Sequence, residues 1–357
     1  MDYIKETKDI SAEEAIILWQ ASRLSLSKSY EKAPEILKVH SSVIGTLGNF
    51  SASIGKAKSK KTFNVSAIVA AALKNGTVLR YVAELPEDKR KVLYVDTEQS
   101  PYHCLKVMTR ILRMAGLPDD RDNENLEFLA LRKYTPEQRI RIVEQAIYNT
   151  PDIGLVIIDG IRDMVYDINS PGESTRIISK LMQWTDDRQI HIHTILHQNK
   201  GDENARGHIG TELNNKAETV LQVEKDKGNG DISHVSAIHI RAMDFEPFAF
   251  RINDKTLPEL IEGYKPETKK PGRPEEEKFD PYRHITEQHR IALEAAFGLK
   301  EEYGYKELED ALIKIYMSVG VKLNHKKAVS LITMLRNKRM IVQENGRKYT
   351  FMPDFHY

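Results

Sequence analysis

The sequence has almost no cysteine and no long hydrophobic segment. Among its 357 residues Cys104 is the single cysteine, which excludes an intramolecular disulfide framework and any zinc site built from cysteines. No apolar run approaches the roughly 20 residues of a membrane span, and the start, MDYIKETKDISAEE, lacks a cationic region followed by an apolar segment. We therefore expect a cytoplasmic protein without a membrane partner, in which Cys104 is a small core residue.

The chain also lacks a net charge of either sign. Its 53 Lys and Arg residues are balanced by 52 Asp and Glu residues, which leaves a formal net charge of +1. Any contact with nucleic acid must then come from local basic patches, because the surface as a whole is not basic. The length predicts about two domains and allows a sizeable core.

A phosphate-binding motif with one departure is present at residues 55–62, GKAKSKKT. The usual pattern is Gly-x-x-x-x-Gly-Lys-Ser/Thr, and Lys60 stands where the second glycine belongs. In such a loop backbone N–H groups face the β-phosphate, Lys61 reaches the β/γ oxygens, and the hydroxyl of Thr62 holds Mg²⁺. The segment LGNFSASI before the motif predicts a buried strand, and TFNVSAIVAAALK after it predicts a helix whose N-terminus faces the anion. A basic, solvated loop is the alternative, because the motif contains four lysines.

After this motif the sequence predicts alternating strands and helices. The predicted strands are residues 91–99, 126–132, 153–160 and 190–200, and the predicted helices are 101–116, 136–149 and 175–187. This alternation favours an α/β fold with a mostly parallel sheet and helices on both faces. Beyond Lys216 three further strands, joined in part by the turn KGNGD, indicate an antiparallel extension that makes the sheet mixed.

The composition divides the chain into four predicted parts. Residues 1–40 are expected to be a helical preface, with one amphipathic helix in SAEEAIILWQASRLSL, and residues 41–262 to be the α/β domain. Residues 263–280 combine prolines, glycines and dense charge with almost no apolar content, so they predict a linker. In residues 281–357 three helical patterns precede two short strands around an Asn-Gly turn, which suggests a winged-helix domain.

Two of the predicted strands end in carboxylates. The strand GLVIIDG ends in Asp159, where a nucleotide hydrolase places the carboxylate that orients Mg²⁺ through water. The strand VLYVDTEQ ends in Asp96, Thr97 and Glu98, and a carboxylate there is suited to polarise the attacking water as general base. Strands that end in aspartate are common, so this interpretation depends on the order of the motifs along the chain.

Polar groups follow two later strands. His197 and Gln198 come at the end of one strand, where they are suited to touch a γ-phosphate, and the loop 199–210 follows them. Simple flexibility between strands is the alternative for this loop. Arg241 lies at the end of another strand, where an arginine can reach the nucleotide of a partner subunit, although a solvated arginine is the more frequent case.

Together these features resemble RecA-like ATPases, and more closely the RepA-like hexameric helicase ATPases of plasmids and mobile elements. The resemblance covers residues 35–255 and rests on the ordered set of motifs. It implies a RecA-like fold with ATP and Mg²⁺ as cofactors. The matching residues are Lys61 and Thr62 for Walker A, Glu98 for the catalytic glutamate and Asp159 for the Walker B aspartate.

The resemblance also implies a γ-phosphate sensor, a DNA contact and an assembly. Gln198, with His197, falls at the sensor position, residues 199–210 fall at a DNA-facing loop, and Arg241 falls near the strand end from which a cation enters the neighbouring site, so a ring or filament is implied. Thr62 and Asp159 are the predicted metal-site residues. The predicted nucleotide-binding residues are Gly55, Lys56, Ala57, Lys58, Ser59, Lys60, Lys61, Thr62, Asp159 and His197, and the predicted catalytic residues are Glu98, Lys61, Gln198 and Arg241.

Two features depart from this family. Lys60 replaces a glycine whose lack of a side chain lets the loop wrap the phosphate, so its Cβ is expected to crowd the loop, although the ammonium of Lys60 or Lys58 can add charge. The winged helix lies outside the core RecA-like fold, and its cations are suited to bind DNA phosphates. A solvated face is the alternative, because acidic residues lie on the preceding segments. The predicted DNA-binding residues are Lys200, Arg206, Lys326, Lys327, Arg336, Lys338, Arg339, Arg347 and Lys348.

The leading hypothesis is therefore an oligomeric ATP-hydrolysing DNA motor, a helicase for replication or mobilisation of a mobile element. Single-stranded DNA is expected in a central channel or duplex DNA at the winged helix. An ATP-gated DNA-binding regulator with slow or no turnover is the alternative, and an inactive nucleotide binder that serves as a structural DNA-binding protein is a third.

Overall fold

The computed structural model of the chain describes residues 10–198, 207–226, 228–264, 286–318, 321–344 and 348–353. The chain divides into two compact units, Met1–Pro266 and Glu267–Tyr357. Among the described residues no helix combines the length and the apolar character that crossing a membrane requires.

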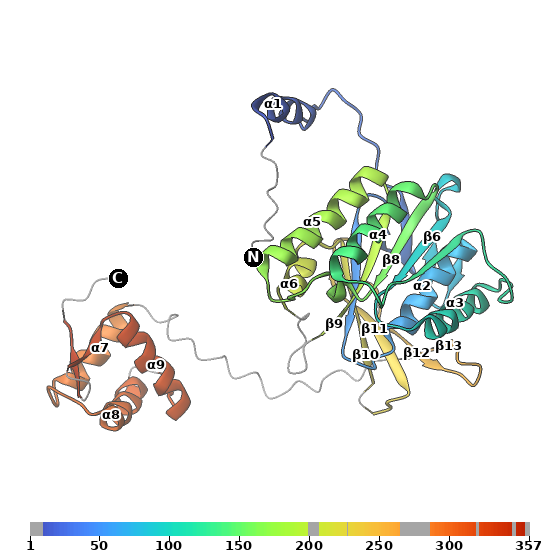
Figure 1. The fold of residues 1–357 in the computed structure, drawn as a ribbon. Helices are drawn as coiled ribbons and strands as arrows, with labels where there is room; N and C mark the ends of the chain where they lie inside the picture. Colours follow the sequence, from blue (N-terminus) through green and yellow to red (C-terminus); the bar gives the residue numbers. More distant parts are fainter. Residues whose placement is uncertain are drawn as a thin grey trace. The chain divides into compact units, whose positions relative to one another are not determined.

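In the described part of the first unit, a nine-stranded mixed sheet forms the centre (Figure 1). Its strand order is β13-β12-β11-β10-β3-β9-β8-β6-β7, parallel from β10 to β7 and antiparallel from β10 to β13. The strands are β3 (Phe50–Gly55), β6 (Lys91–Asp96), β7 (Leu126–Ala130), β8 (Ile153–Asp159), β9 (His191–His197), β10 (Thr219–Lys225), β11 (Ile232–Ile240), β12 (Phe248–Ile252) and β13 (Pro258–Ile261). The predicted mixed, mostly parallel sheet is confirmed.

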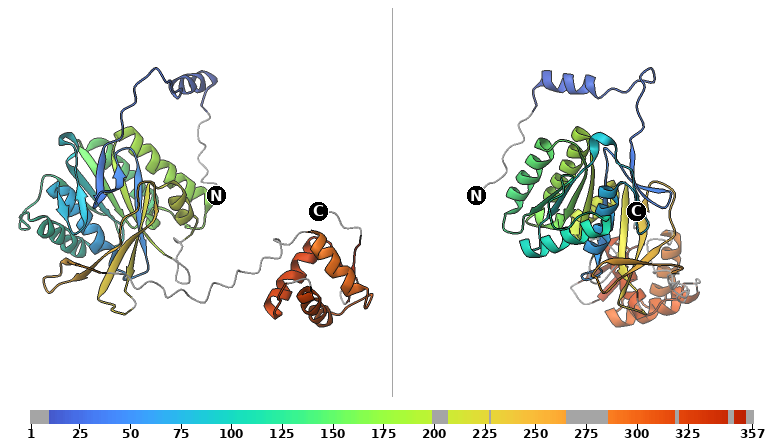
Figure 2. Two further views of the ribbon diagram at one scale, coloured as in Figure 1. Left: turned by 180° about the vertical axis from the view of Figure 1, so that it is seen from behind. Right: turned by 90° about the vertical axis from the view of Figure 1, so that its right-hand side faces the viewer.

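Helices cover both faces of this sheet, as predicted (Figure 2). One hydrophobic cluster joins the sheet to α2 (Lys61–Lys74) and α3 (Pro101–Ala115), and Cys104 is buried in α3. A second cluster joins the other face to α4 (Pro136–Asn149), α5 (Pro171–Arg188) and α6 (Gly207–Lys216). Because helices cover both faces, every residue of the central strand β8 is buried.

A second, four-stranded antiparallel sheet was not predicted. Its order is β2-β1-β5-β4. The strands are β1 (Glu35–Val39), β2 (Ser42–Thr46), β4 (Thr77–Val78) and β5 (Tyr81–Ala83). β1 therefore lies inside residues 1–40, for which the sequence predicts only helical or irregular structure. Its apolar Ile36, Leu37 and Val39 are buried because they pack in the same cluster as α2.

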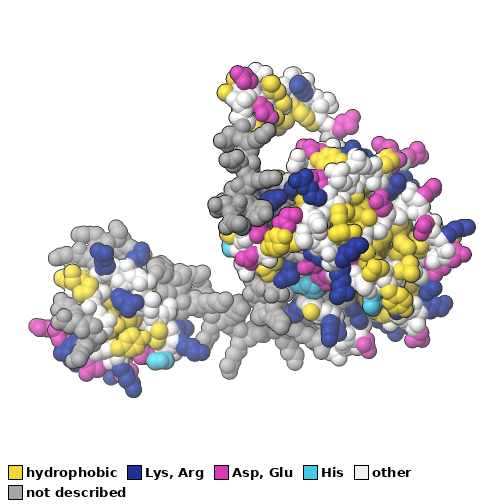
Figure 3. All heavy atoms as spheres, in the orientation of Figure 1, with side chains coloured by type: hydrophobic (Ala, Val, Ile, Leu, Met, Phe, Trp, Pro, Cys, Tyr) yellow, Lys and Arg dark blue, Asp and Glu magenta, His cyan; other side chains and the backbone are white. Residues whose placement is uncertain are grey.

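The expected N-terminal helix is present as α1 (Ala12–Ala21). It begins at Ser11, whose hydroxyl accepts the N–H of Glu14 at 3.1 Å. None of its residues is buried. Hydrophobic side chains therefore lie open along it (Figure 3), including Ile16, Ile17, Leu18 and Trp19.

The segment after β9 differs from the predicted loop 199–210. Residues 199–206, with Lys200 and Arg206, lie outside the described residues, whereas α6 already begins at Gly207. Ile209 and Leu213, one helical turn apart, are buried in the second cluster. This burial stabilises a helix in GHIGTELNNK, a sequence with two glycines and two asparagines.

In its described residues the second unit contains three helices followed by a β-hairpin. These are α7 (Thr286–Phe297), α8 (Tyr305–Ser318), α9 (His325–Asn337), β14 (Ile341–Glu344) and β15 (Lys348–Phe351). They enclose a hydrophobic cluster of their own, to which Leu308, Leu312, Leu331 and Leu335 contribute. The predicted Asn-Gly turn and Arg347 lie outside the described residues.

A buried chain of hydrogen bonds links β3 to β9 inside the sheet. The carbonyl oxygen of Thr46 can only accept, so His191 donates to it from Nδ1 at 2.9 Å. His191 Nε2 then accepts from Ser51 at 2.7 Å, Ser51 accepts from Nδ1 of His193 at 2.7 Å, and Nε2 of His193 accepts from Ser53 at 2.8 Å. All four bonds therefore run in one direction, and both imidazoles are neutral.

Burial lowers the pKa of both histidines, that of His193 to about 3. An unfolded histidine has a pKa near 6.5, so below that pH the unfolded chain binds the additional proton and the native state loses stability. We expect His193 alone to reduce the free energy of unfolding by about 2 kcal/mol between pH 7 and pH 5.

Denaturant titrations at the two pH values test this expectation. His193→Gln should be less stable at pH 7 but show a smaller acid-induced loss, whereas the exposed His239→Gln should keep the wild-type loss. An unchanged loss in His193→Gln would contradict the assignment.

Candidate active site

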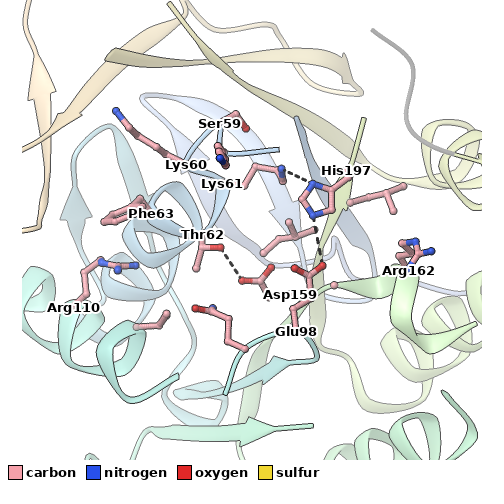
Figure 4. A pocket seen from close by; sticks show the side chains of 16 residues that line it. Ser59, Lys60, Lys61, Thr62, Phe63, Glu98, Arg110, Asp159, Arg162 and His197 are labelled. Carbon is pink, nitrogen blue, oxygen red and sulfur yellow. Dashed lines mark hydrogen bonds and ion pairs between the residues drawn. The ribbon is translucent and has the colours of Figure 1, made fainter. Parts of the chain in front are cut away.

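A cleft of about 330 Å³ opens where the parallel strands β3, β9, β8 and β6 end (Figure 4). The carboxyl ends of neighbouring parallel strands meet at one edge of a sheet, and ligands commonly bind there. The cleft brings together most of the residues predicted for chemistry. The predicted residues that line it are Lys58, Ser59, Lys60, Lys61, Thr62, Glu98, Asp159 and His197.

Gly55 begins the phosphate loop because no larger residue fits there. A Cβ at this position would lie 2.3 Å from the carbonyl oxygen of Val223 and 2.7 Å from Oγ of Ser59. The loop then crosses the exposed Lys56 and Ala57 and reaches α2, whose first residue is Lys61. The predicted order of strand, loop and helix is therefore present, and the helix N-terminus lies at the cleft.

Lys60 adopts the backbone conformation of the glycine that it replaces. Its φ of 66° and ψ of 29° are left-handed, which costs a residue with a Cβ about 1 kcal/mol. The ammonium donates to the carbonyl oxygen of Asp231, in the turn before β11, and the side chain points away from Lys61 (Figure 4). The Lys60 side chain is thus directed toward the β10–β11 turn, while the predicted crowding by its Cβ stays a prediction.

The Lys61 ammonium is held by two carbonyl groups of its own loop and by His197 of β9. Its Nζ donates to the carbonyl oxygens of Gly55 at 2.8 Å and Lys56 at 3.0 Å, and to Nδ1 of His197 at 3.1 Å. Burial lowers the pKa of Lys61 to about 8, although Asp159 and Glu98 favour its charged form. The amine therefore lies at the centre of the loop, within reach of an anion bound there.

Asp159 and Thr62 meet on the floor of the cleft. The Thr62 hydroxyl donates to Oδ2 of Asp159 at 3.1 Å, and the Tyr94 hydroxyl donates to the same oxygen at 2.9 Å. Burial, with the nearby Asp96 charge, raises the pKa of Asp159 to about 7. A hydroxyl and a carboxylate at this separation are a suitable pair for Mg²⁺ and its water.

Glu98 is presented by a turn that Asp96 stabilises. The buried Asp96 carboxylate accepts the N–H groups of Glu98 at 2.9 Å and Gln99 at 2.7 Å, and the Gln99 side-chain amide at 2.6 Å. The hydrogen bond with His197 is the main cause that lowers the pKa of Glu98. Glu98 is therefore ionised and able to accept a proton.

His197 connects the two charged groups of the cleft. Because the Lys61 ammonium donates to Nδ1, the ring proton is on Nε2, which lies 3.5 Å from Oε1 of Glu98. Gln198 is buried instead, does not line the cleft, and its backbone N–H donates to Gly55 at 3.1 Å. Of the two predicted sensor residues, His197 is the one that faces the cleft.

Arg241 lies at the other edge of the sheet. It follows β11 directly, is exposed, and its N–H donates to the carbonyl oxygen of Glu218 at 3.2 Å. The end of β11 pairs with Thr219 at the start of β10, whereas the phosphate loop follows the end of β3, which is parallel to β10. Arg241 is therefore not part of the cleft of its own chain.

Several residues of the cleft were not predicted. The Arg110 guanidinium lies 3.7 Å from the ring centre of Phe63, and both side chains line the cleft with Arg162. Arg110 is a single arginine within a helix, and nothing in the sequence indicates that it faces the cleft. Tyr94 does not line the cleft but supports Asp159 from the buried interior. It precedes Asp96 by two residues and therefore lies on the same face of β6, which the alternation along a strand predicts.

In the second unit, the described cations predicted to bind DNA lie on α9, in the turn after it and on the hairpin. Lys326, Arg336, Lys338 and Arg339 are exposed and Lys327 is half-buried. Lys348 forms an ion pair with Glu302 at 2.8 Å, so its charge is partly compensated.

The comparisons with known proteins address the first unit. Residues 31–203 match a family described as AAA domain. No curated protein sequence matches the chain significantly. Among solved structures, the chain is similar to the crystal structure of the RadB recombinase, with 15% identity, a TM-score of 0.41, and coverage of 59% of this chain and 90% of that chain. The match over residues 31–203 supports a RecA-like P-loop ATPase domain in the first unit.

Proposed function

We propose that this ATPase is an oligomeric ATP-hydrolysing DNA motor, and more specifically a helicase for the replication or mobilisation of a mobile element. The match of residues 31–203 to the AAA domain family supports nucleotide-dependent activity. The observation that carries the proposal is the convergence of Lys61, Thr62, Asp159, Glu98 and His197 on one cleft at the end of a parallel sheet. These groups supply the phosphate-binding cation, the metal-site pair, the base and a sensor of hydrolysis.

The cleft residues fit ATP and Mg²⁺. Gly55 lies so close to β10 that a Cβ would collide, and the Lys61 amine and the helix N-terminus favour a phosphate beside the loop. Within the described ranges no cluster of three or more His, Cys, Asp or Glu side chains forms a metal site. Thr62 and Asp159, which are hydrogen-bonded to each other, would hold Mg²⁺ together with phosphate oxygens and water, and the metal would neutralise phosphate charge.

The chain's own residues divide the remaining work. Lys61 exchanges its contacts with Gly55, Lys56 and His197 for phosphate oxygens, which releases His197. The ionised Glu98 orients the attacking water and accepts its proton. His197, which contacts both Lys61 and Glu98, is suited to sense whether the γ-phosphate is present.

We propose a winged-helix domain for the second unit and DNA as its ligand. Three helices and a hairpin with exposed cations on α9 support this assignment. Contacts from Lys326, Arg336 and Arg339 to phosphates would make affinity fall steeply with salt.

A switch with slow turnover is the second candidate, and the phosphate loop gives a specific reason for it. Lys60 donates to Asp231, and Lys61 donates to three acceptors of the protein. A phosphate would compete with these acceptors for the Lys61 ammonium, which reduces the free energy gained on binding. In this case ATP would control assembly while the second unit selects a DNA site.

ATP hydrolysis with Mg²⁺ and no DNA, single-stranded DNA or duplex DNA distinguishes these functions. Stimulation by single strands, together with displacement of a labelled strand from a partial duplex, supports the motor. Tight duplex binding with slow turnover supports the switch. No turnover in any condition contradicts the proposed motor.

Arg241→Ala tests the proposed assembly. Arg241 is not part of its own cleft, and the resemblance to RecA-like ATPases implies that it acts on the neighbour's nucleotide. The substitution should therefore reduce turnover at least tenfold without changing ATP affinity in the dispersed protein. Arg241→Ala subunits are then mixed with Lys61→Ala subunits, which lack the phosphate-binding cation of their own cleft. Turnover of these mixed assemblies shows whether Arg241 acts on its own nucleotide or on that of the neighbouring subunit. Normal turnover in Arg241→Ala assemblies would remove the trans role.

A further inference from the structure

Arg139, in the first turn of α4, directs its guanidinium at backbone carbonyl oxygens. Nε donates to Leu131 at 3.2 Å, Nη1 to Asp163 at 2.6 Å, and Nη2 to Arg132 at 3.0 Å and Thr97 at 3.5 Å. Among the described residues it forms no ion pair with a carboxylate. The guanidinium of Arg139 therefore binds the main chain.

The residues that carry these carbonyl groups lie just beyond the carboxyl ends of three neighbouring strands. Thr97 comes directly after β6, Leu131 and Arg132 come directly after β7, and Asp163 lies in the 3₁₀ turn (Ile161–Met164) after β8. The sheet order is β8-β6-β7. One side chain thus joins the ends of all three strands, at the edge where the cleft opens.

Only arginine suits this arrangement. A guanidinium has five N–H donors in a rigid plane, whereas a lysine ammonium is a compact charge with three. Without the guanidinium, the carbonyl groups of Thr97 and Asp163 would need new partners, which is costly, whereas that of Leu131 keeps the N–H of Tyr134 at 3.1 Å. Arg139 does not line the cleft, so it acts through the residues that it holds.

The residues held by Arg139 are adjacent to the catalytic carboxylates. Thr97 precedes Glu98, and its hydroxyl lies 3.1 Å from the Asp159 carbonyl oxygen and 3.0 Å from Oδ2 of Asp163. The contact is tight, because a Cβ on Gly160 would lie 2.1 Å from that hydroxyl oxygen. A shift of Thr97 would therefore displace Glu98 relative to Asp159.

We propose that Arg139 is a positioning residue that fixes Glu98 and Asp159 relative to each other by clamping the ends of β6, β7 and β8. The inference rests on the proposed ATP hydrolysis for its effect on rate, but the clamp itself consists only of contacts to the protein's own main chain. The two parts are therefore tested separately.

Hydrogen exchange of the nucleotide-free full-length protein tests the clamp. Arg139→Gln should accelerate exchange of amides in residues 96–99 and 160–164 by about tenfold or more, while amides of β3 and β10 keep their wild-type rates. Arg141→Gln, an exposed arginine two residues along α4, is the matched control and should change none of them. Unchanged exchange in Arg139→Gln, or acceleration throughout the domain, would overturn the proposal.

Kinetics test the consequence for catalysis. Misplacement near 1 Å costs about 10²-fold in rate, so we expect kcat in Arg139→Gln to fall roughly 10- to 100-fold with ATP affinity, measured by a fluorescent nucleotide, changed less than about threefold. Arg139→Lys should restore part of the loss, and it replaces Arg139→Gln in both experiments if that variant does not fold. Equal losses of kcat and affinity, or no loss, would overturn the role. If wild type hydrolyses no ATP, the proposed function fails and the exchange experiment alone decides the clamp.

Discussion

Glu98→Gln is expected to lower kcat for ATP hydrolysis by roughly 10²- to 10⁴-fold, the contribution of a positioned general base. The carboxylate lines the cleft, is kept ionised by His197, and is fixed by the turn at Asp96. A glutamine has the same size but no basic oxygen, so it retains the geometry without accepting the proton. ATP affinity should therefore change little.

Single-turnover hydrolysis and equilibrium nucleotide binding measure these two effects separately. Glu124→Gln is the matched control, because Glu124 is exposed in a loop of the same unit, and it should behave as wild type. Hydrolysis by Glu98→Gln at the wild-type rate would show that another group is the base.

Lys61→Met is expected to weaken ATP binding by roughly 10- to 100-fold, because charge-assisted hydrogen bonds to phosphate contribute about 1.5–3 kcal/mol. Methionine keeps the unbranched apolar stem of the side chain and removes the donor. Lys56→Met removes an exposed lysine of the same loop. It should reduce ATP affinity far less, because Lys56 contributes only to the general positive charge of the loop.

Calorimetric titration with ATP·Mg²⁺ compares the ATP affinities of the two variants. The melting temperatures of both variants are measured without nucleotide. The melting temperatures matter because Lys61 also binds Gly55, Lys56 and His197 in the free protein. Equal affinity losses in the two variants would mean that Lys61 has no special place in the loop.

The central part of the fold could be predicted because its signals are local. The apolar run that forms β8 is long enough to read as a buried strand, and the phosphate motif marks the junction of β3 and α2. The small sheet could not be predicted in the same way. β4 has two residues and β5 three, so neither is long enough to show alternation, and both depend on packing beside α2.

The candidate site shows the same division. Glu98 and Asp159 were predicted because each follows a recognisable strand, and the structure brings both into one cleft. Arg139 carries no signal, because its partners are carbonyl groups, which every residue has. Arg241 lies away from its own cleft because β11 is antiparallel to β10 and β10 is parallel to β3, and the sequence indicated only the first of these pairings.

The hydrogen-bonded chain between β3 and β9 has a consequence for biosynthesis. Ser51 and His191 are 140 residues apart, and β10, the other neighbour of β3, comes later still. At ribosomal rates of about 5–20 residues per second, β3 waits on the order of ten seconds for its first partner strand. During translation its apolar residues and both of its edges are open to wrong pairing. Chaperone dependence in a cell-free translation system should therefore arise while β3 has emerged and β9 has not.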